Sequence, residues 1–237
     1  MKRSVLCFVF LIFVLICVFF LKFSIVPAIN ENLVFPNPKT CIIDAGHGGF
    51  DGGAVASDGT LEKDLNLAMA KKLDEILTLN GYETIMIRNE DISVEEKTDR
   101  HKKKGDIRKR LKIARQYPNA LFISIHQNSF KQRNSYGTQV FYGVKNEKSE
   151  KLANILQNTI TETLQPDNRR SIKKAGKNLY LLSNMENVSV MVECGFISNN
   201  DELEKLKDPK YQEKLMFEVF EGIEKYFKEE EIESGKD

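Results

Sequence analysis

The sequence predicts an α/β protein, a single domain on a mostly parallel, twisted sheet of about six strands flanked by helices, preceded by an N-terminal transmembrane or signal helix. Strand-like apolar runs alternate with amphipathic helical patterns along the chain, which is typical of parallel sheets. The 237 residues, 41% of them hydrophobic and 29% charged, suit one domain with a proper core. A long apolar run close to the start lies apart from this pattern.

That apolar run, Val5–Leu21, follows Lys2 and Arg3 and ends at a lysine. It is at the short end of what spans a bilayer, about 17–25 residues, and longer than a usual signal-peptide core of about 7–15. Because Pro27 makes a poor cleavage site, we expect residues 1–24 to be an uncleaved membrane anchor; a cleaved signal peptide is the alternative. In both cases the rest of the chain is expected on the extracytoplasmic face of the membrane.

Overall charge and cysteine content exclude two classes of protein. The 35 basic and 34 acidic residues nearly cancel, so nothing global indicates nucleic-acid binding. Two of the four cysteines lie in the apolar run, and the other two, Cys41 and Cys194, adjoin strand-like segments. We expect them to be buried small side chains, with a single disulfide between them as the alternative. The chain is not a disulfide scaffold.

A proline-containing linker is expected over 25–39, the catalytic domain over 40–228 and a polar, frayed tail over 229–237. The expected strands are Thr40–Asp44, Tyr82–Arg88, Ala120–Ile125, Gly137–Tyr142, Asn178–Leu182 and Val188–Val192. The expected helices are Thr60–Asn80 with Thr60 as N-cap, Asp106–Tyr117, Glu147–Leu164, and Asp201–Lys228 broken near Pro209. The charged segment Asn89–Lys104 is interpreted as a solvated loop, with contact to anionic wall or lipid groups as the alternative.

Three expected strands lead to side chains that can bind a metal or transfer a proton: His47, His126 and Glu193. Ligands gather beyond the carboxyl ends of parallel strands, so these side chains are expected to converge, with Glu62 joining them from the first turn of a helix. Two histidines and a carboxylate suit a catalytic zinc that keeps one position open for water. A further, uncoordinated glutamate is what such a site needs as a base.

Each of these residues also has a purely structural interpretation. Glu62 could complement the helix dipole, His126 could be a hydrogen-bonded histidine at a strand end, and Glu193 could be the buried partner of an arginine. Taken together these readings are weaker, because a glutamate at the end of an apolar strand is costly unless it is paired, bound or functional. His101, in the lysine-rich segment, is expected to be a spectator.

Four segments resemble, in order, the zinc-dependent N-acetylmuramoyl-L-alanine amidases of the Amidase_3 type: Ile43–Gly49, Leu61–Asn66, Ser124–Ser129 and Val192–Asn199. The resemblance covers about residues 40 to 226. It implies that His47, Glu62 and His126 hold Zn²⁺, that Glu193 is the catalytic glutamate, and that Asn128 contacts substrate. Gln127 and Ser129 stand where small alanines are common in the family.

This resemblance implies hydrolysis of the amide between N-acetylmuramic acid and L-alanine in peptidoglycan. The anchor-plus-domain layout, the charged insert before Arg108–Leu111, and Gly137–Tyr142 look like the spore-cortex, germination-specific subgroup, which removes peptide before muramic-δ-lactam forms. The implied partners are a glycan strand with its stem peptide and the membrane, with no nucleic acid. Because no wall-binding repeat is visible in the sequence, a protein activator is a further expectation.

Two other classes of function remain open from the sequence. One is another zinc hydrolase of the same polymer, a carboxypeptidase or deacetylase, which uses similar ligands. The other is a non-catalytic, anchored wall-binding protein with a structural zinc, against which an uncoordinated Glu193 argues. In the glycine loop, Asp44 and Asp51 are expected to orient the site or cap turns rather than to bind metal.

Overall fold

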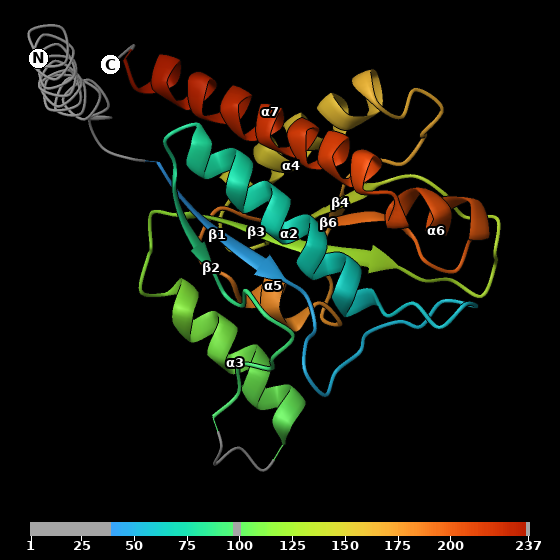
Figure 1. The fold of residues 1–237 in the computed structure, drawn as a ribbon. Helices are drawn as coiled ribbons and strands as arrows, with labels where there is room; N and C mark the ends of the chain where they lie inside the picture. The colour runs from blue at the N-terminus through green and yellow to red at the C-terminus, as the bar shows by residue number, and fades with distance from the viewer. Residues whose placement is uncertain (1–38, 97–100, 236–237) are drawn as a thin grey trace, which may run out of the picture. The chain divides into compact units, whose positions relative to one another are not determined.

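The computed structural model describes residues 39–96 and 101–235, which form one α/β domain on a six-stranded sheet (Figure 1). The strands are β1 Thr40–Ala45, β2 Glu83–Met86, β3 Leu121–Asn128, β4 Gln139–Tyr142, β5 Lys173–Lys174 and β6 Ser189–Phe196. The helices are α2 Glu62–Leu79, α3 Lys102–Ala114, α4 Lys148–Thr163, α5 Tyr180–Asn184, α6 Asn200–Lys207 and α7 Pro209–Ser234.

The sheet is mixed, with the strand order β2-β1-β3-β6-β4-β5. The four strands β2, β1, β3 and β6 pair in parallel. β4 runs antiparallel to β6, and β5 is parallel to β4. The mostly parallel sheet is therefore confirmed, with a reversed edge. The carboxyl ends of β1, β3 and β6 meet at one edge of the parallel part, where chemistry is expected.

Helices cover both faces of the sheet, as Figure 1 shows: α2, α4 and α7 on one side, α3 and α5 on the other. Successive residues of β1 point to opposite faces of the sheet. Ile43 packs in the large core under α2 and α7, and Ile42 packs in the smaller core under α3 and α5. Burial on both faces explains why these central strands read as continuous apolar runs rather than as alternating ones.

The strand expected over Asn178–Leu182 is wrong, because this segment contains helix α5. Short apolar runs do not separate strand from helix by pattern alone. The edge of β4 that such a strand would need is taken by β5, which the sequence did not indicate. A helical turn instead buries Leu181 and Met185 in the smaller core.

Several helix boundaries also differ from expectation. α3 begins at Lys102, so the lysine-rich end of the expected loop forms the first helical turn. α2 has Leu61 as its N-cap rather than Thr60, and no side chain caps it. α7 continues through Ser234, so most of the expected frayed tail is helical, while the break at Pro209 is confirmed, with the Asp208 side chain capping the new helix.

The expected anchor at residues 1–24 and nearly all of the linker lie outside the described residues. In the part that the structure describes, no helix is both long enough and apolar enough to cross a membrane. Cys41 and Cys194 are buried free thiols, as expected, so the disulfide alternative is wrong. Burial raises the pKa of both thiols far above the usual range.

Candidate active site

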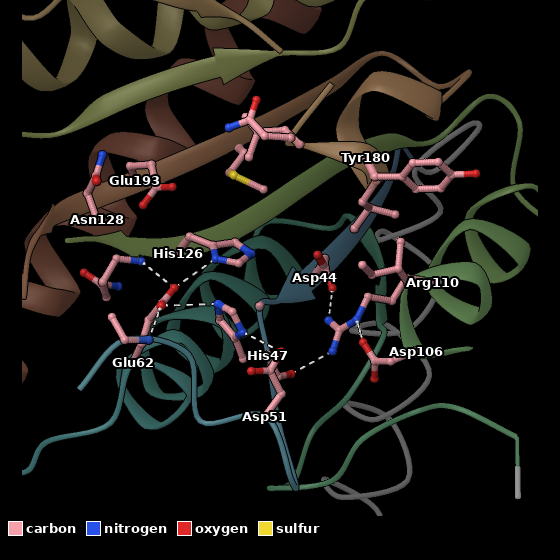
Figure 2. A pocket seen from close by; sticks show the side chains of 18 of the residues that line it. Asp44, His47, Asp51, Glu62, Asp106, Arg110, His126, Asn128, Tyr180 and Glu193 are labelled. Carbon is pink, nitrogen blue, oxygen red and sulfur yellow. Dashed lines mark hydrogen bonds and ion pairs between the residues drawn. The ribbon is translucent and has the colours of Figure 1, made fainter. Parts of the chain in front are cut away.

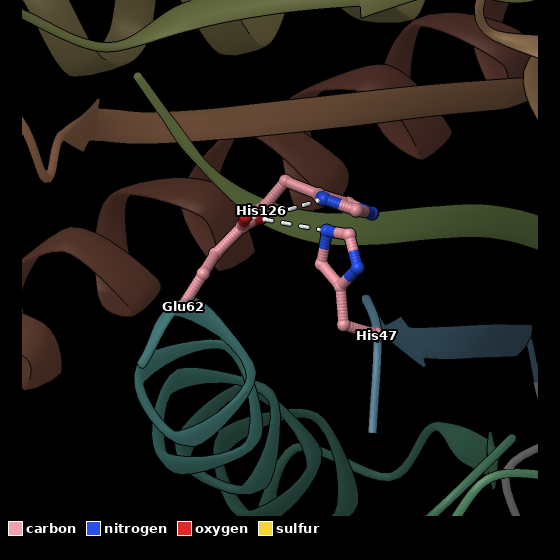
Figure 3. A group of neighbouring side chains, drawn as sticks. All are labelled: His47, Glu62 and His126. Atoms are coloured by element: carbon pink, nitrogen blue, oxygen red, sulfur yellow. Dashed lines mark hydrogen bonds and ion pairs between the residues drawn. The ribbon is translucent and has the colours of Figure 1, made fainter. Parts of the chain in front are cut away.

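The sheet brings two histidines and one glutamate together (Figure 3). His47 follows β1, His126 lies in β3, and Glu62 is the first residue of α2. The two carboxylate oxygens of Glu62 each face one ring, at 3.2 Å from His47 Nε2 and 2.9 Å from His126 Nδ1. One ligand atom from each residue lies within 4.8 Å of the others. This spacing would let all three side chains bind one metal ion.

Glycines create the space for this cluster. A Cβ on Gly46 would lie 2.2 Å from His126 Nε2, and one on Gly53 would lie 2.6 Å from Glu62 Oε2. His47 itself has a φ of 59°, in the left-handed region that is costly for a residue with a side chain. This backbone conformation directs the imidazole from the end of β1 towards Glu62. Because the conformation is strained, other contacts must hold the loop in it.

Glu62 is held in place by several hydrogen bonds. Its Oε2 accepts from the Ala54 amide at 2.9 Å, and its Oε1 accepts from the Gln127 amide at 3.2 Å and from Asn66 Nδ2 at 3.3 Å. Burial disfavours its charged form, but the hydrogen bonds from His126 and His47 outweigh this and lower its pKa well below the usual range. Glu62 is therefore an anion, as a metal ligand must be.

Asp51 orients the His47 ring, and Asp44 does not. Asp51 Oδ2 lies 2.9 Å from His47 Nδ1 and 3.0 Å from Lys103 Nζ in the first turn of α3. A carboxylate on Nδ1 keeps a proton on that nitrogen, so Nε2, which faces Glu62, is the atom that would bind a metal. The contact agrees with the expectation that a loop aspartate orients the site.

Asp44 instead anchors the loop through a buried arginine. Arg110 of α3 donates to Asp44, to Asp106 Oδ2 at 2.6 Å, to the Ala45 carbonyl at 2.9 Å and to the His47 carbonyl at 2.7 Å (Figure 2). Burial opposes the charge on Asp44, but Arg110 lowers its pKa below the usual value. The strained backbone of His47 is thus tied to α3.

A second buried arginine supports the same loop from the other side. Arg88 donates to the carbonyls of Ala45 and Gly46, both at 2.9 Å, and to that of Lys63, also at 2.9 Å. It therefore connects the end of β1 to the first turn of α2. Together with Arg110 it supplies donors to three successive carbonyls, those of residues 45, 46 and 47.

Glu193 lies on β6 beside His126, its partner in the β3–β6 register, and faces the same pocket (Figure 2). Its Oε2 is buried and has no hydrogen-bond partner among the described residues. Burial raises its pKa to about 7, and the neighbouring Glu62 charge adds to this effect. A carboxylate with a free oxygen and such a pKa is suited to take up and return a proton near neutral pH.

The pocket has a volume of about 350 Å³ and extends from the histidine–glutamate cluster to α3 and α5. Asn128 and Ser129 line it at the end of β3, and Tyr180 of α5 lines its far wall. Asn128 Oδ1 accepts the Ser129 amide hydrogen, which leaves its NH₂ group to donate to a ligand. Gln127 points away into the core, where its amide donates to Asn66.

The structure adds residues that the sequence reasoning missed. Asn66 holds Glu62 and the Gly46 carbonyl, and it could have been found because it lies four residues after Glu62, on the same helical face. Nothing in the sequence marked Arg88 and Arg110 as part of the site, because a buried arginine cannot be distinguished there from an exposed one. Lys103 was interpreted as part of a solvated loop.

Comparison with known proteins agrees with this geometry. The Amidase_3 model, described as N-acetylmuramoyl-L-alanine amidase, matches residues 41–225. The germination-specific N-acetylmuramoyl-L-alanine amidase of Bacillus subtilis is 34% identical over 194 residues, covering 81% of each chain. The structure of the CwlD amidase from Clostridioides difficile in complex with the GerS lipoprotein is 37% identical, with a TM-score of 0.76, over 80% of this chain and 98% of that one.

A second solved structure, an N-acetylmuramoyl-L-alanine amidase from Clostridium difficile 630, is 28% identical, with a TM-score of 0.72, over 81% of this chain and 98% of that one. The family match spans most of the chain and includes every element that carries the site. The family is metal-dependent, and a cluster able to hold a metal lies within the match. This chain belongs to the Amidase_3 family and is an N-acetylmuramoyl-L-alanine amidase acting on peptidoglycan.

Proposed function

We propose that this amidase depends on zinc and acts in spore-cortex maturation, removing stem peptides from muramic acid before muramic-δ-lactam forms. The similarity to a germination-specific amidase supports the spore role. The donor set supports zinc, because two imidazoles and one carboxylate are a common set at catalytic zinc sites. The convergence of His47, Glu62 and His126 is the observation that carries the proposal.

In this proposal His47, Glu62 and His126 hold the ion. A zinc ion bound there would lower the pKa of a water towards about 7 and polarise the scissile carbonyl. The protein's own contribution is to fix the ligands. Asp51 keeps the His47 ring in one tautomer, while the bonds to Ala54, Asn66 and Gln127 fix the Glu62 carboxylate.

Glu193 is the proposed acid–base group. Its unpartnered Oε2 accepts a proton from the attacking water and returns that proton to the leaving L-alanine nitrogen. A pKa of about 7 makes both transfers accessible near neutral pH. The NH₂ group of Asn128, free in the pocket wall, is proposed to donate to a substrate carbonyl and so to orient the bond to be cleaved.

The test of Glu193 is the variant Glu193→Gln, assayed on purified peptidoglycan with mass spectrometry of the products. Loss of a general base lowers the rate by about 10²–10⁴-fold. Bound zinc, measured by elemental analysis, should stay near one ion per chain, and the exposed control Glu204→Gln should keep full activity. Wild-type products must carry free L-alanine amino termini. Full activity of Glu193→Gln, or activity unaffected by a strong chelator, contradicts the mechanism.

We further propose the organisation that the sequence indicates: residues 1–24 export or anchor the chain, 25–39 link it, and 40–228 act on the wall outside the membrane. A protein partner is also proposed, since the CwlD amidase was solved with a lipoprotein. Complementation of a Bacillus subtilis strain lacking its germination-specific amidase tests the spore role, and spores without muramic-δ-lactam would count against it. Full activity of the purified domain alone would count against a required activator.

A further inference from the structure

Two segments with no acidic residue, 129–144 and 168–185, carry a group of cations on the protein surface. We call this group the cationic rim: Lys131, Arg133, Arg169, Arg170, Lys173, Lys174 and Lys177. All are exposed except Arg170, which is partly buried. In a chain whose 35 basic and 34 acidic residues nearly cancel, this is a strong local separation of charge.

The two segments contact each other directly. Arg170 Nε donates to the Tyr136 carbonyl at 2.7 Å, and Gln139 Nε2 donates to the Ser171 carbonyl at 2.8 Å. β5, which consists of Lys173 and Lys174, pairs with β4 directly after these contacts. The backbones that carry these cations therefore lie side by side at the reversed edge of the sheet, where Lys173 and Lys174 of β5 point to opposite faces.

Most of the rim cations lack an acidic partner. Many other surface lysines are paired, such as Lys151 with Glu230 at 3.0 Å. Within the described residues no ion pair involves these five rim members: Lys131, Arg133, Lys173, Lys174 and Lys177. Lysines on an edge strand can guard against aggregation. That role would explain β5, but not Lys131 and Arg133, which lie in the loop between β3 and β4.

The rim also borders the catalytic pocket. Glu193 of β6 and Gln139 of β4 are direct partners, so their side chains share one face of the sheet. Gln139 Oε1 in turn accepts from Arg170 at 3.4 Å. The side chain of Gln139 thus connects Arg170 of the rim to the strand position beside Glu193. At its other end, Lys177 is followed by Asn178, which lines the pocket.

We propose that the cationic rim binds the acidic stem peptides of peptidoglycan and so holds the polymer beside the pocket. Stem peptides carry free carboxylates and recur along every glycan strand, so an extended, unpaired cationic surface is complementary to them. This inference rests on the proposed function for its substrate. It assigns to the catalytic domain a wall-binding role for which the sequence shows no separate module.

The test is a sedimentation assay in which the zinc-loaded protein is mixed with insoluble purified peptidoglycan, without reading turnover. The rim variant is Lys173→Gln/Lys174→Gln/Lys177→Gln. Its matched control, Lys71→Gln/Lys210→Gln/Lys214→Gln, removes the same charge from exposed positions of α2 and α7. Thermal melting of both proteins checks that they fold alike.

We expect the rim variant to bind peptidoglycan about tenfold more weakly and the control to bind as wild type does, since each exposed ion pair contributes a few-fold at most. Wild-type binding should weaken with salt and when the polymer's carboxylates are converted to amides. Equal losses in both variants, or no loss in the rim variant, overturn the proposal. The same assay is repeated with phosphatidylglycerol vesicles in place of peptidoglycan. If the rim variant loses binding to the vesicles but not to peptidoglycan, the proposal is also overturned, because the rim would then bind a membrane. Failure of the proposed zinc chemistry would instead show as inactivity of a wild-type protein that still sediments.

Discussion

Replacing Arg110 with methionine should be among the most damaging single changes in the domain. The guanidinium is 3% exposed and donates to two carboxylates and to the carbonyls of Ala45 and His47. Methionine fills the volume but leaves Asp44, which is fully buried, with only Ser124 as a donor. Breaking a buried ion pair in this way costs about 3–5 kcal/mol of unfolding free energy. That is a large part of the about 5–15 kcal/mol available to a typical domain.

The assay is urea unfolding of wild type, Arg110→Met, Asp44→Asn and the double variant. The double variant leaves no buried unpaired charge at residue 44, so it should be more stable than the sum of the single losses predicts, by about 1–3 kcal/mol. Additive losses, or a cost below about 1 kcal/mol for Arg110→Met, would refute the interpretation of Asp44 and Arg110 as a coupled buried pair.

The contribution of Asp44 to the free energy of unfolding should change with pH in opposite directions in wild type and in Arg110→Met. In wild type the pKa of Asp44 lies below its unfolded value of about 3.9, so its contribution to stability is present above that pH and lost as the pH falls through the folded pKa. In Arg110→Met the Ser124 hydrogen bond and the His126 charge still lower that pKa, but burial, the largest effect, should outweigh them and raise it above the unfolded value. The loss of unfolding free energy in Arg110→Met, relative to wild type, should therefore become smaller as the pH falls from 7 to 5. A loss that stays constant over this range would count against this account.

Two further predictions concern the ligands. Asp51→Asn should weaken zinc binding about 10–100-fold in competition with a chelating dye, because an amide no longer fixes the His47 tautomer; unchanged affinity would show that Asp51 only shapes the loop. Gly46→Ala should abolish zinc binding, since its Cβ would lie 2.2 Å from the His126 ring, whereas Gly52→Ala, whose nearest neighbour would be 3.6 Å away, should bind zinc as wild type does.

The sequence predicted the parallel part of the fold well because periodicity and burial agree there. The strands at Thr40, Ala120 and Val188 are apolar on both faces and lead to His47, His126 and Glu193, so both their type and the position of the site follow from the pattern. The edge was predicted poorly. β5 is two exposed lysines, which carry no strand signal, and α5 is too short for a helical period to appear.

The proposed ligands and base were predictable from the sequence because each stands near the end of a strand or at the start of a helix, next to a recognisable motif. Apart from Asp51, which lies four residues after His47, the residues that position them were not predictable, because their role depends on distance in space. Arg110 lies 63 residues after the His47 carbonyl that it holds, and Asn66 meets Gln127 across 61 residues. Only Asn66 shares an element with the group that it supports, Glu62, and only there could spacing have revealed it.

The glycine loop shows why Asp44 and Asp51 could not be told apart in advance. Asp44 is still within β1, where the alternation of the strand points its side chain towards α3 and Arg110. Asp51 comes after the chain has reversed through His47, Gly48 and Gly49, all with positive φ, and this reversal returns its carboxylate to the His47 ring. One aspartate therefore fixes the backbone of the proposed ligand and the other fixes its ring. Because Arg110 and Lys103 each pair with one of them, α3 supports both contacts, and a change in the position of this helix would reach the metal cluster through two routes.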